Sequence, residues 1–142
     1  MSELLKLENQ ICFPFYAISR KITQLYTPYL NELNITYPQY LVLLVLWEKD
    51  NILVKDICKK LWLETNTISP LLKTLNNKWI IEKKCWSENK KEIRVLLSQK
   101  WKELKLLAEK IPLKIAHSTE IEQEKLKQLH TNLWDLVKIF EK

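Results

Sequence analysis

The stretch Val54-Lys-Asp-Ile-Cys-Lys-Lys-Leu61, followed by Trp62-Leu-Glu-Thr-Asn66 and then by Thr67-Ile-Ser-Pro-Leu-Leu-Lys73, decides the fold. In its first part, apolar residues recur at 54, 57, 58 and 61, which is the spacing of one face of a short helix. A second helical pattern follows a short polar turn and runs to about Asn77. The apolar face of this second helix consists of Ile68, Leu71, Leu72 and Leu75. Two short helices joined by a tight turn predict a helix-turn-helix.

The opposite face of the second helix carries short polar side chains, with one lysine and no acid. Its residues are Asn66, Ser69, Pro70, Lys73 and Asn77. In a helix-turn-helix the second helix is the one that enters the major groove of DNA. We therefore expect this face to contact double-stranded DNA.

Two alternating segments, residues 80–84 and 93–97, flank the polar tip Ser87-Glu-Asn-Lys-Lys91 and predict a β-hairpin, the wing of a winged helix. Residues 52–100 hold 11 Lys/Arg and 5 Asp/Glu, while the rest of the chain holds 12 of each, so the whole net charge of +6 lies on this unit. A local basic patch is typical of a surface that binds the phosphate backbone, although a solvated basic face without a partner is the alternative. The basic residues of the wing are Lys83, Lys84, Lys90, Lys91 and Arg94.

The composition excludes several classes of protein. A chain of 142 residues suits one domain with its own core. No apolar run is as long as a membrane span and no signal-peptide pattern opens the chain, so we expect no membrane partner. Three cysteines without a Cys-x-x-Cys pair, and only two histidines, favour neither a disulfide framework nor a zinc site. We expect no metal and no cofactor, and we expect the protein to be located in a reducing cytoplasm.

The middle of the chain should form the core. Thr36 and Gln39 have the spacing of a capping box, and Pro38 lies in the first helical turn. The helix that follows, residues 40–48, is apolar nearly all round and should be the buried central helix, with Trp47 in the core. After the wing, Ser98 can cap a helix from about Trp101 to Ala116, which Pro112 should bend or divide.

A heptad pattern of apolar residues lies near each end of the chain. The N-terminal pattern, within a helical segment from residue 4 to 30, consists of Ile11, Phe15, Ile18, Ile22, Leu25 and Tyr29. Pro14 interrupts it, so either the helix kinks there or a new helix starts near Cys12 with Pro14 in its first turn. The C-terminal pattern consists of Leu126, Leu129, Leu133, Leu136 and Phe140.

These two patterns predict a dimer. The last helix should be capped by Ser118 or Thr119, with Glu122 completing a capping box for Thr119. Because one core is already available in the middle, we infer a single domain in which residues 1–35 and 101–142 form a homodimer interface around a winged helix-turn-helix at 36–100. The alternative is that both patterns pack within one subunit as an ordinary bundle.

The chain resembles the MarR family of winged-helix regulators, and within it the OhrR, MgrA and SarZ group of thiol-based sensors, over essentially its whole length. The most specific segments are Leu7-Glu-Asn-Gln-Ile-Cys-Phe13, Leu33-Asn-Ile-Thr-Tyr-Pro-Gln-Tyr40, Leu46-Trp-Glu48 and Thr67-Ile-Ser-Pro-Leu-Leu-Lys73. The resemblance implies a mainly α fold with a small β-hairpin wing and a homodimer, most simply a repressor, on a pseudo-palindromic operator. It also adds Thr67 to the residues expected to contact DNA.

The resemblance implies a redox role for Cys12. In this group a cysteine near the start of the first helix is oxidised by organic hydroperoxide, and two tyrosines from the partner subunit bind its thiolate; Tyr26 and Tyr37 stand at the matching positions. The thiolate is the reactive form, and the sulfenic acid it yields condenses with another thiol, such as a low-molecular-weight thiol. The alternatives are a structural Cys12 in a regulator that senses a small aromatic ligand, and a thiol enzyme; we expect no enzyme activity.

The chain departs from the family pattern at several positions. Lys91 stands where the family has an arginine, so the planar fork that fits a narrow minor groove is lost. Trp79 and Trp101 stand where glycine is common, and Trp79 falls at a helix end that needs a left-handed residue. Of the other cysteines, Cys58 should belong to the core and Cys85 to the wing.

Overall fold

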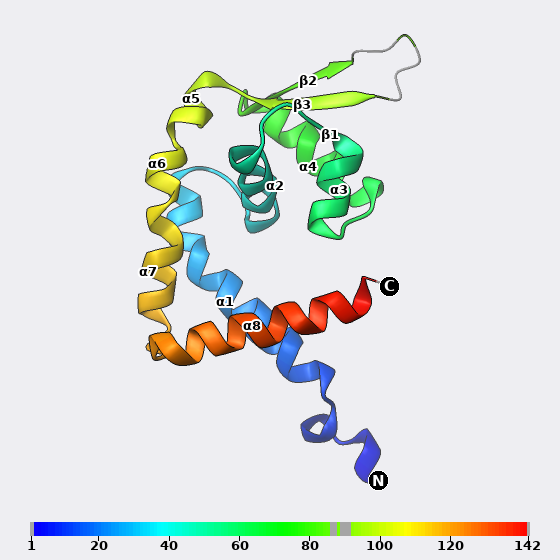
Figure 1. Ribbon diagram of the computed structural model, residues 1–142, viewed down its shortest axis with the longest axis vertical. Coiled ribbons are helices and arrows are strands. Elements are labelled where there is room, and N and C mark those ends of the chain that lie inside the picture. Colours follow the sequence, from blue (N-terminus) through cyan, green and yellow to red (C-terminus); the bar gives the residue numbers. More distant parts are fainter. Residues whose placement is uncertain (1, 86–87, 89–91, 142) are drawn as a thin grey trace.

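The computed structural model describes residues 2–85, 88 and 92–141. Its centre is helix α2 (Tyr37–Glu48), which packs against α1, α3, α4 and β3 (Figure 1). The predicted capping box is confirmed, because the Thr36 hydroxyl accepts a hydrogen bond from the Gln39 N–H at 3.4 Å and the Gln39 side chain accepts one from the Thr36 N–H at 3.0 Å. Seven of its residues are buried, including Trp47, so it is the predicted core helix.

The helix-turn-helix and the wing are both present. They comprise β1 (Ile52–Leu53), α3 (Val54–Leu61), α4 (Thr65–Asn77), β2 (Ile81–Cys85) and β3 (Ile93–Leu97). The sheet is antiparallel in the order β1-β3-β2, with Val95 of β3 paired to Ile52 on one side and to Lys83 on the other. The hairpin prediction is confirmed but missed β1, because a strand of two residues carries no readable alternation. Most of the predicted tip, including Lys90 and Lys91, lies outside the described residues.

The first helix starts at Cys12. This helix is α1 (Cys12–Glu32), and two short 3-10 helices precede it, η1 (Glu3–Leu5) and η2 (Leu7–Asn9). The helical pattern expected from residue 4 is therefore wrong before Cys12, where the Asn9 side chain donates to the Glu3 carbonyl at 2.7 Å and folds the chain back. The second alternative for Pro14 is confirmed, since it lies in the first turn, where no backbone N–H is needed.

The helix after the wing is divided into three segments, α5 (Gln99–Glu103), α6 (Lys105–Ala108) and α7 (Lys110–Ser118). Pro112 lies in the first turn of α7 and cannot donate to the carbonyl of Ala108, which accounts for the second break and confirms the expected division. The expected Ser98 cap is wrong in its chemistry. Ser98 occupies the cap position, but its hydroxyl makes no capping bond and is buried without a hydrogen-bond partner among the described residues.

The last helix, α8 (Gln123–Phe140), starts later than the sequence predicts. The Thr119 hydroxyl donates to the Ala116 carbonyl at 2.8 Å, and that of Ser118 donates to the Ile115 carbonyl at 2.8 Å. Both hydroxyls are thus used at the end of α7, and Glu120 adopts a left-handed φ of 56° that separates the two helices. The predicted capping box is therefore wrong, and Glu122 stands at the cap position of α8 without a side-chain capping bond.

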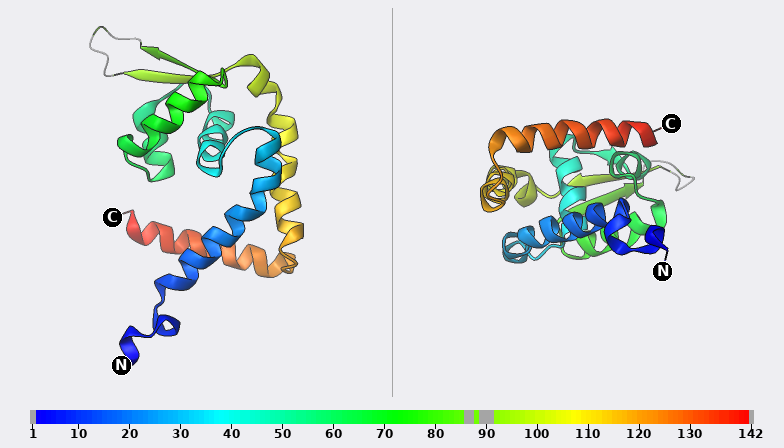
Figure 2. Two further views of the ribbon diagram at one scale, coloured as in Figure 1. Left: turned by 180° about the vertical axis from the view of Figure 1, so that it is seen from behind. Right: turned by 90° about the horizontal axis from the view of Figure 1, so that it is seen from below.

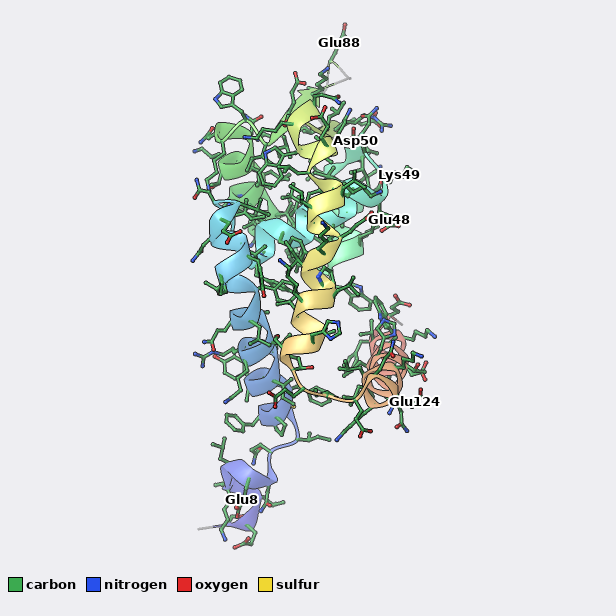
Figure 3. The ribbon with its side chains drawn as sticks, turned by 90° about the vertical axis from the view of Figure 1, so that its left-hand side faces the viewer. Glu8, Glu48, Lys49, Asp50, Glu88 and Glu124 are labelled. Atoms are coloured by element: carbon green, nitrogen blue, oxygen red, sulfur yellow. The ribbon has the colours of Figure 1, made fainter. Side chains whose placement is uncertain are left out.

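The two terminal helices do not form a bundle within the chain. Helix α1 lies beside α7, whereas α8 leaves the end of α7 and stands apart from α1 when the molecule is seen from below (Figure 2) and from the side (Figure 3, where Glu124 marks α8). Within the described chain, α8 buries none of its residues and α1 buries only Leu30. The two heptad patterns therefore face outward. Among the described helices, none is long and apolar enough to cross a membrane.

Candidate DNA interface and redox site

The rotation of α4 about its axis is fixed by its apolar face. Ile68, Leu72 and Leu75 are fully buried against α2, α3 and β2. The opposite face is therefore held outward, and the sequence-predicted contact residues on it are all exposed: Asn66, Thr67, Ser69, Pro70 and Lys73. Within α4 this face has one cation and no carboxylate, which suits a polyanionic partner.

Pro70 adds a backbone feature to this face. It lies inside α4, where it has no N–H to donate to the carbonyl of Asn66, four residues earlier. The Asn66 carbonyl therefore lacks the helical hydrogen bond that residue 70 would otherwise donate. One turn later, the Thr74 hydroxyl donates to the Pro70 carbonyl at 3.1 Å. The sequence placed Pro70 on the outward face but did not predict this interruption of the helical hydrogen bonds.

The predicted wing residues differ in their surroundings. Arg94, on β3, donates from Nη1 to the Asn51 carbonyl at 2.8 Å, so part of its guanidinium holds the turn before β1 to the sheet. Lys83 and Lys84 are exposed on β2. Lys90 and Lys91 lie outside the described residues.

The tyrosines expected to serve the redox site lie together, and Cys12 does not lie with them. The rings of Tyr26 on α1 and Tyr37 on α2 are 5.1 Å apart between centroids in an edge-to-face contact. Cys12 is the exposed first residue of α1. It precedes Tyr26 by fourteen residues of continuous helix, which at a rise of 1.5 Å per residue is roughly 21 Å. One subunit therefore cannot bring its own Cys12 to its own tyrosine pair.

The other two cysteines have different environments. Cys58 is partly buried against the core as predicted, and its sulfur lies 3.9 Å from the Thr65 hydroxyl. Cys85 is exposed at the end of β2.

A third tyrosine, Tyr40, completes the aromatic cluster. Its ring centroid lies 5.6 Å from that of Tyr26 and 6.1 Å from that of Tyr37. It is fully buried, and among the described residues its hydroxyl has no hydrogen-bond partner, which costs roughly 1–3 kcal/mol. The sequence reasoning missed Tyr40, although its spacing of three residues from Tyr37 places both on one helix face.

The phenols of the cluster are held in their protonated form. Burial raises the pKa of Tyr26, and Tyr37 beside it raises it further; burial alone raises the pKa of Tyr37. Burial, followed by the neighbouring Tyr26 and Tyr37, raises the pKa of Tyr40 to about 12. All three groups can therefore act as hydrogen-bond donors at neutral pH.

The end of α2 is tied to α5 and α6 by polar contacts. The indole Nε1 of Trp47 donates to the Trp101 carbonyl at 2.7 Å, and the two indole rings stack with centroids 6.5 Å apart. Lys105 donates to the Trp47 carbonyl at 3.0 Å. Asp50, labelled in Figure 3, accepts from the Leu97 N–H at 2.8 Å and pairs with Lys102 at 3.1 Å. Trp101 is thus a buried structural residue at a position where the family resemblance led us to expect glycine.

A hollow of about 340 Å³ lies between α2 and the α6–α7 column. Its walls are mainly apolar, with charged groups from both helices. Its lining residues are Tyr40, Leu44, Trp47, Glu48, Lys105, Ala108, Glu109 and Pro112.

Residues 24–106 match the family described as transcriptional regulator SarA/Rot. The chain belongs to this family. Over 133 residues it is 41% identical to the organic hydroperoxide resistance transcriptional regulator of Bacillus subtilis (strain 168), covering 94% of this chain and 90% of that protein. It is 29% identical over 142 residues to the HTH-type transcriptional regulator MgrA of Staphylococcus aureus, covering 99% and 97%. These matches confirm the family resemblance predicted from the sequence.

Solved structures of AbfR from Staphylococcus epidermidis show the same fold as this SarA/Rot-family chain. Reduced AbfR bound to DNA has a TM-score of 0.76 at 29% identity, with 99% of this chain and 98% of that chain covered. Disulfide-formed AbfR has a lower TM-score of 0.66 at 30% identity, with 99% and 96% covered. Overoxidized AbfR bound to DNA has a TM-score of 0.75, so the fold described here is closer to both DNA-bound forms of that relative than to its disulfide form.

Proposed function

We propose that this protein is a homodimeric, sequence-specific DNA-binding regulator of transcription, most simply a cytoplasmic repressor, whose binding to its operator is controlled by oxidation of Cys12. The observation that carries the proposal is the outward face of α4, which is exposed, free of acid and fixed in orientation by the core. The likeness to AbfR bound to DNA, over nearly the whole of both chains, supports the same reading. The wing would supply further phosphate contacts.

The exposed heptad patterns support the homodimer. On α1, Phe15 and Ile18 are half exposed, and on α8 the same is true of Leu133 and Leu136. Two apolar stripes that no other part of the described chain covers are what a helical dimer interface would bury. A dimer would also present two copies of α4 to successive major grooves, which requires a pseudo-palindromic operator.

The redox part of the proposal rests on the place of Cys12 and on the relatives. The chain is 41% identical to a regulator named for organic hydroperoxide resistance, and AbfR has been solved in reduced, overoxidized and disulfide-formed states. The separation of Cys12 from Tyr26 along α1 supports a site made of two subunits. In it, Tyr26 and Tyr37 would donate hydrogen bonds to the thiolate of the partner's Cys12.

The chemistry is a two-electron oxidation. The Cys12 thiolate attacks the terminal oxygen of an organic hydroperoxide, the O–O bond breaks, and the products are a sulfenic acid and the alcohol once the alkoxide has taken a proton. A second thiol, such as a low-molecular-weight thiol, then displaces water from the sulfenic acid and forms a mixed disulfide. In both the sulfenic acid and the mixed disulfide, Cys12 no longer carries the negative charge that the tyrosine hydroxyls would bind.

The test is operator binding before and after oxidation. A gel shift with the DNA upstream of the protein's own coding region is performed with and without cumene hydroperoxide, on the wild type and on Cys12→Ser. The wild type should release the DNA after oxidation and rebind it after reduction, and Cys12→Ser should bind throughout. Cys58→Ser and Cys85→Ser are matched controls that should still respond. Release of DNA by peroxide from Cys12→Ser would contradict the redox assignment.

The hollow between α2 and the α6–α7 column favours one alternative, a regulator that releases DNA on binding a small aromatic or phenolic ligand. Its volume of about 340 Å³ and its mainly apolar walls are within the range of small-molecule sites. In that case salicylate would weaken operator binding and peroxide would not, and Cys12 would be structural. The gel shift with each compound separates the two functions.

The proposal is for a regulator and not for an enzyme. A thiol peroxidase would reduce many equivalents of peroxide for each protein chain when excess thiol is supplied. The regulator should consume about one equivalent per Cys12 before reduction and show no sustained turnover.

A further inference from the structure

An unbroken series of aromatic contacts leads from the tyrosine pair to the start of the α5–α7 column. Tyr26 and Tyr37 both contact Tyr40, whose ring lies 6.3 Å from that of Trp47, and Trp47 in turn stacks on Trp101. These residues come from α1, from both ends of α2, and from α5. Figure 1 shows α2 between α1 and the sheet, with α5 directly after β3. The series therefore ends in α5, where the wing joins the helical segments α5–α7.

Tyr40 is the one member of this series that touches both the tyrosine pair and Trp47. Its ring is fully buried, so that packing fixes its position. Its hydroxyl, however, has no hydrogen-bond partner in the described part of the chain. Buried polar groups are nearly always hydrogen-bonded, so a native exception calls for a reason. A hydroxyl that gains a partner in only one state of the protein provides one.

We propose that Tyr40 is a positioning residue that transmits the redox state of Cys12 from Tyr26 and Tyr37 to the contact between Trp47 and Trp101. This inference rests on the proposed function. While Cys12 is reduced, the hydroxyls of Tyr26 and Tyr37 donate to the thiolate of the partner subunit. Oxidation removes that acceptor, and a released hydroxyl turns to the unpaired hydroxyl of Tyr40, whose ring contacts both of the other rings. The resulting tilt of the rings changes the packing of Tyr40 on Trp47.

The far end of the series can move the wing because its last contact is also a polar one. The Trp47 indole donates to the Trp101 carbonyl at 2.7 Å, and Trp101 lies in the first turn of α5. The residue before α5, Ser98, donates from its backbone N–H to the Ile80 carbonyl at 3.0 Å, next to the start of β2. A change at Trp47 therefore acts on both strands of the wing through α5, which gives the coupling a contiguous route.

The test variant is Tyr40→Phe, which removes only the hydroxyl and keeps the ring. Operator affinity is measured for the full-length protein before and after treatment with cumene hydroperoxide, and the fraction of Cys12 oxidised is measured by mass spectrometry on the same samples. For the wild type we expect oxidation to weaken binding by roughly 10-fold or more, within the usual range of allosteric coupling. For Tyr40→Phe we expect the same extent of oxidation and unchanged affinity in the reduced state, but a loss on oxidation below about 3-fold.

The control is Tyr29→Phe, a partly buried residue on the same helix as Tyr26 that packs toward α7, with the Lys114 ammonium group 5.2 Å from its ring centroid. It should keep the wild-type ratio of affinities. A wild-type ratio in Tyr40→Phe would overturn the inference while leaving the proposed function intact. A wild type that holds its DNA after full oxidation would overturn both.

A second variant tests the far end of the series. Trp47→Phe removes the hydrogen bond to the Trp101 carbonyl and should also lower the ratio. If both residues act along one route, the double variant should lower the ratio of reduced-state to oxidised-state affinity no further than the stronger single variant does. If the reductions caused by the two single variants multiply in the double variant, the two residues act independently, which would contradict the proposed series.

Discussion

Both helices of the helix-turn-helix end on a tryptophan in the left-handed conformation. Trp62 has a φ of 57° after α3, and Trp79 has a φ of 59° after α4. At the second of these ends the N–H of Ile80 donates to the Leu75 carbonyl at 3.0 Å and that of Trp79 donates to the Asn76 carbonyl at 3.1 Å. This is the Schellman pattern, which favours glycine at the left-handed position, and the chain contains no glycine. The conformation expected at Trp79 from the sequence is thus confirmed, whereas that at Trp62 was not foreseen.

Replacing Trp79 by glycine should stabilise the protein. The left-handed conformation costs a residue with a Cβ roughly 1–2 kcal/mol, and glycine gives back about 0.5–1 kcal/mol of this through the entropy of the unfolded chain. Because Trp79 is 86% exposed, little packing is lost. We expect the free energy of unfolding to rise by about 0.5–1 kcal/mol in urea titrations with an unchanged m-value. Asn77→Gly, two residues earlier and inside α4, is the control and should lower it.

At the scale of elements, Asp50 joins the end of α2 to β3 and α5, and it should make stability depend on pH. Burial, the largest influence, raises the pKa of Asp50, but hydrogen bonds from the N–H groups of Leu97 and Asn51, together with Lys102, outweigh it and hold the pKa below its ordinary value. A lowered pKa in the folded state means that the ionised group stabilises the fold at neutral pH. This stabilisation is lost as the pH falls through the folded-state pKa.

The variant Asp50→Asn should therefore be destabilised by about 1–2 kcal/mol at pH 7, and the difference from the wild type should shrink below about pH 4. Urea unfolding at pH 7 and at pH 3 measures both values. Asp135→Asn is the control, since the Asp135–Lys138 pair on α8 is largely exposed and should contribute little at either pH. A difference that is equal at the two pH values would show that the charge of Asp50 plays no part.

The α4 element should divide DNA affinity between phosphate and base contacts. If Lys73 touches only phosphate, Lys73→Ala should weaken binding to all sequences alike and reduce the salt dependence by about one counterion. If Ser69 reads a base edge, Ser69→Ala should cost about 1–3 kcal/mol on the operator and relax the preference at one position. Anisotropy titrations at several salt concentrations measure both effects. Lys138→Ala on α8 is the control, and wild-type binding by both α4 variants would count against this interface.

The elements that the sequence predicted best are those whose signal is local. Helix α3 has the predicted ends because apolar residues recur at helical spacing from Val54 to Leu61, and the capping box of α2 depends on residues only three apart. The cap of α8 was mispredicted because Thr119 forms its bond backward to Ala116, and a sequence motif does not show which of two helices a hydroxyl serves. The tyrosine cluster was predicted in part. The contact of Tyr40 with Tyr26 depends on how α1 packs on α2, and local spacing carries no information about it.

At the scale of the whole molecule, the single chain exposes apolar helix surfaces that a second copy would cover. Its core lies in α2, the helix-turn-helix and the sheet and continues along α5–α7 to Ile115, while α8 and the first half of α1 expose apolar residues. Leu133→Asp, in the middle of the α8 stripe, should convert the dimer to a monomer with native helicity, because Leu133 is 47% exposed in the single chain and a charge there costs little unless an interface covers it. Sedimentation velocity distinguishes the two states. Thr131→Asp, exposed on the opposite face of α8, should stay dimeric, and a dimeric Leu133→Asp would place the interface elsewhere.

In the function proposed above, each redox site takes its cysteine from one subunit and its tyrosines from the other. A mixed dimer tests it, with Cys58→Ser and Cys85→Ser in both subunits so that only Cys12 reacts. One subunit carries Cys12→Ser with its tyrosines intact, and the other keeps Cys12 but carries Tyr26→Phe and Tyr37→Phe. The rate at which cumene hydroperoxide converts Cys12 to its sulfenic acid is measured by dimedone labelling. We predict that the mixed dimer reacts at the wild-type rate, because its Cys12 faces the intact tyrosines of the partner, and that the homodimer of the second subunit reacts slowly. A mixed dimer as slow as that homodimer would contradict the claim.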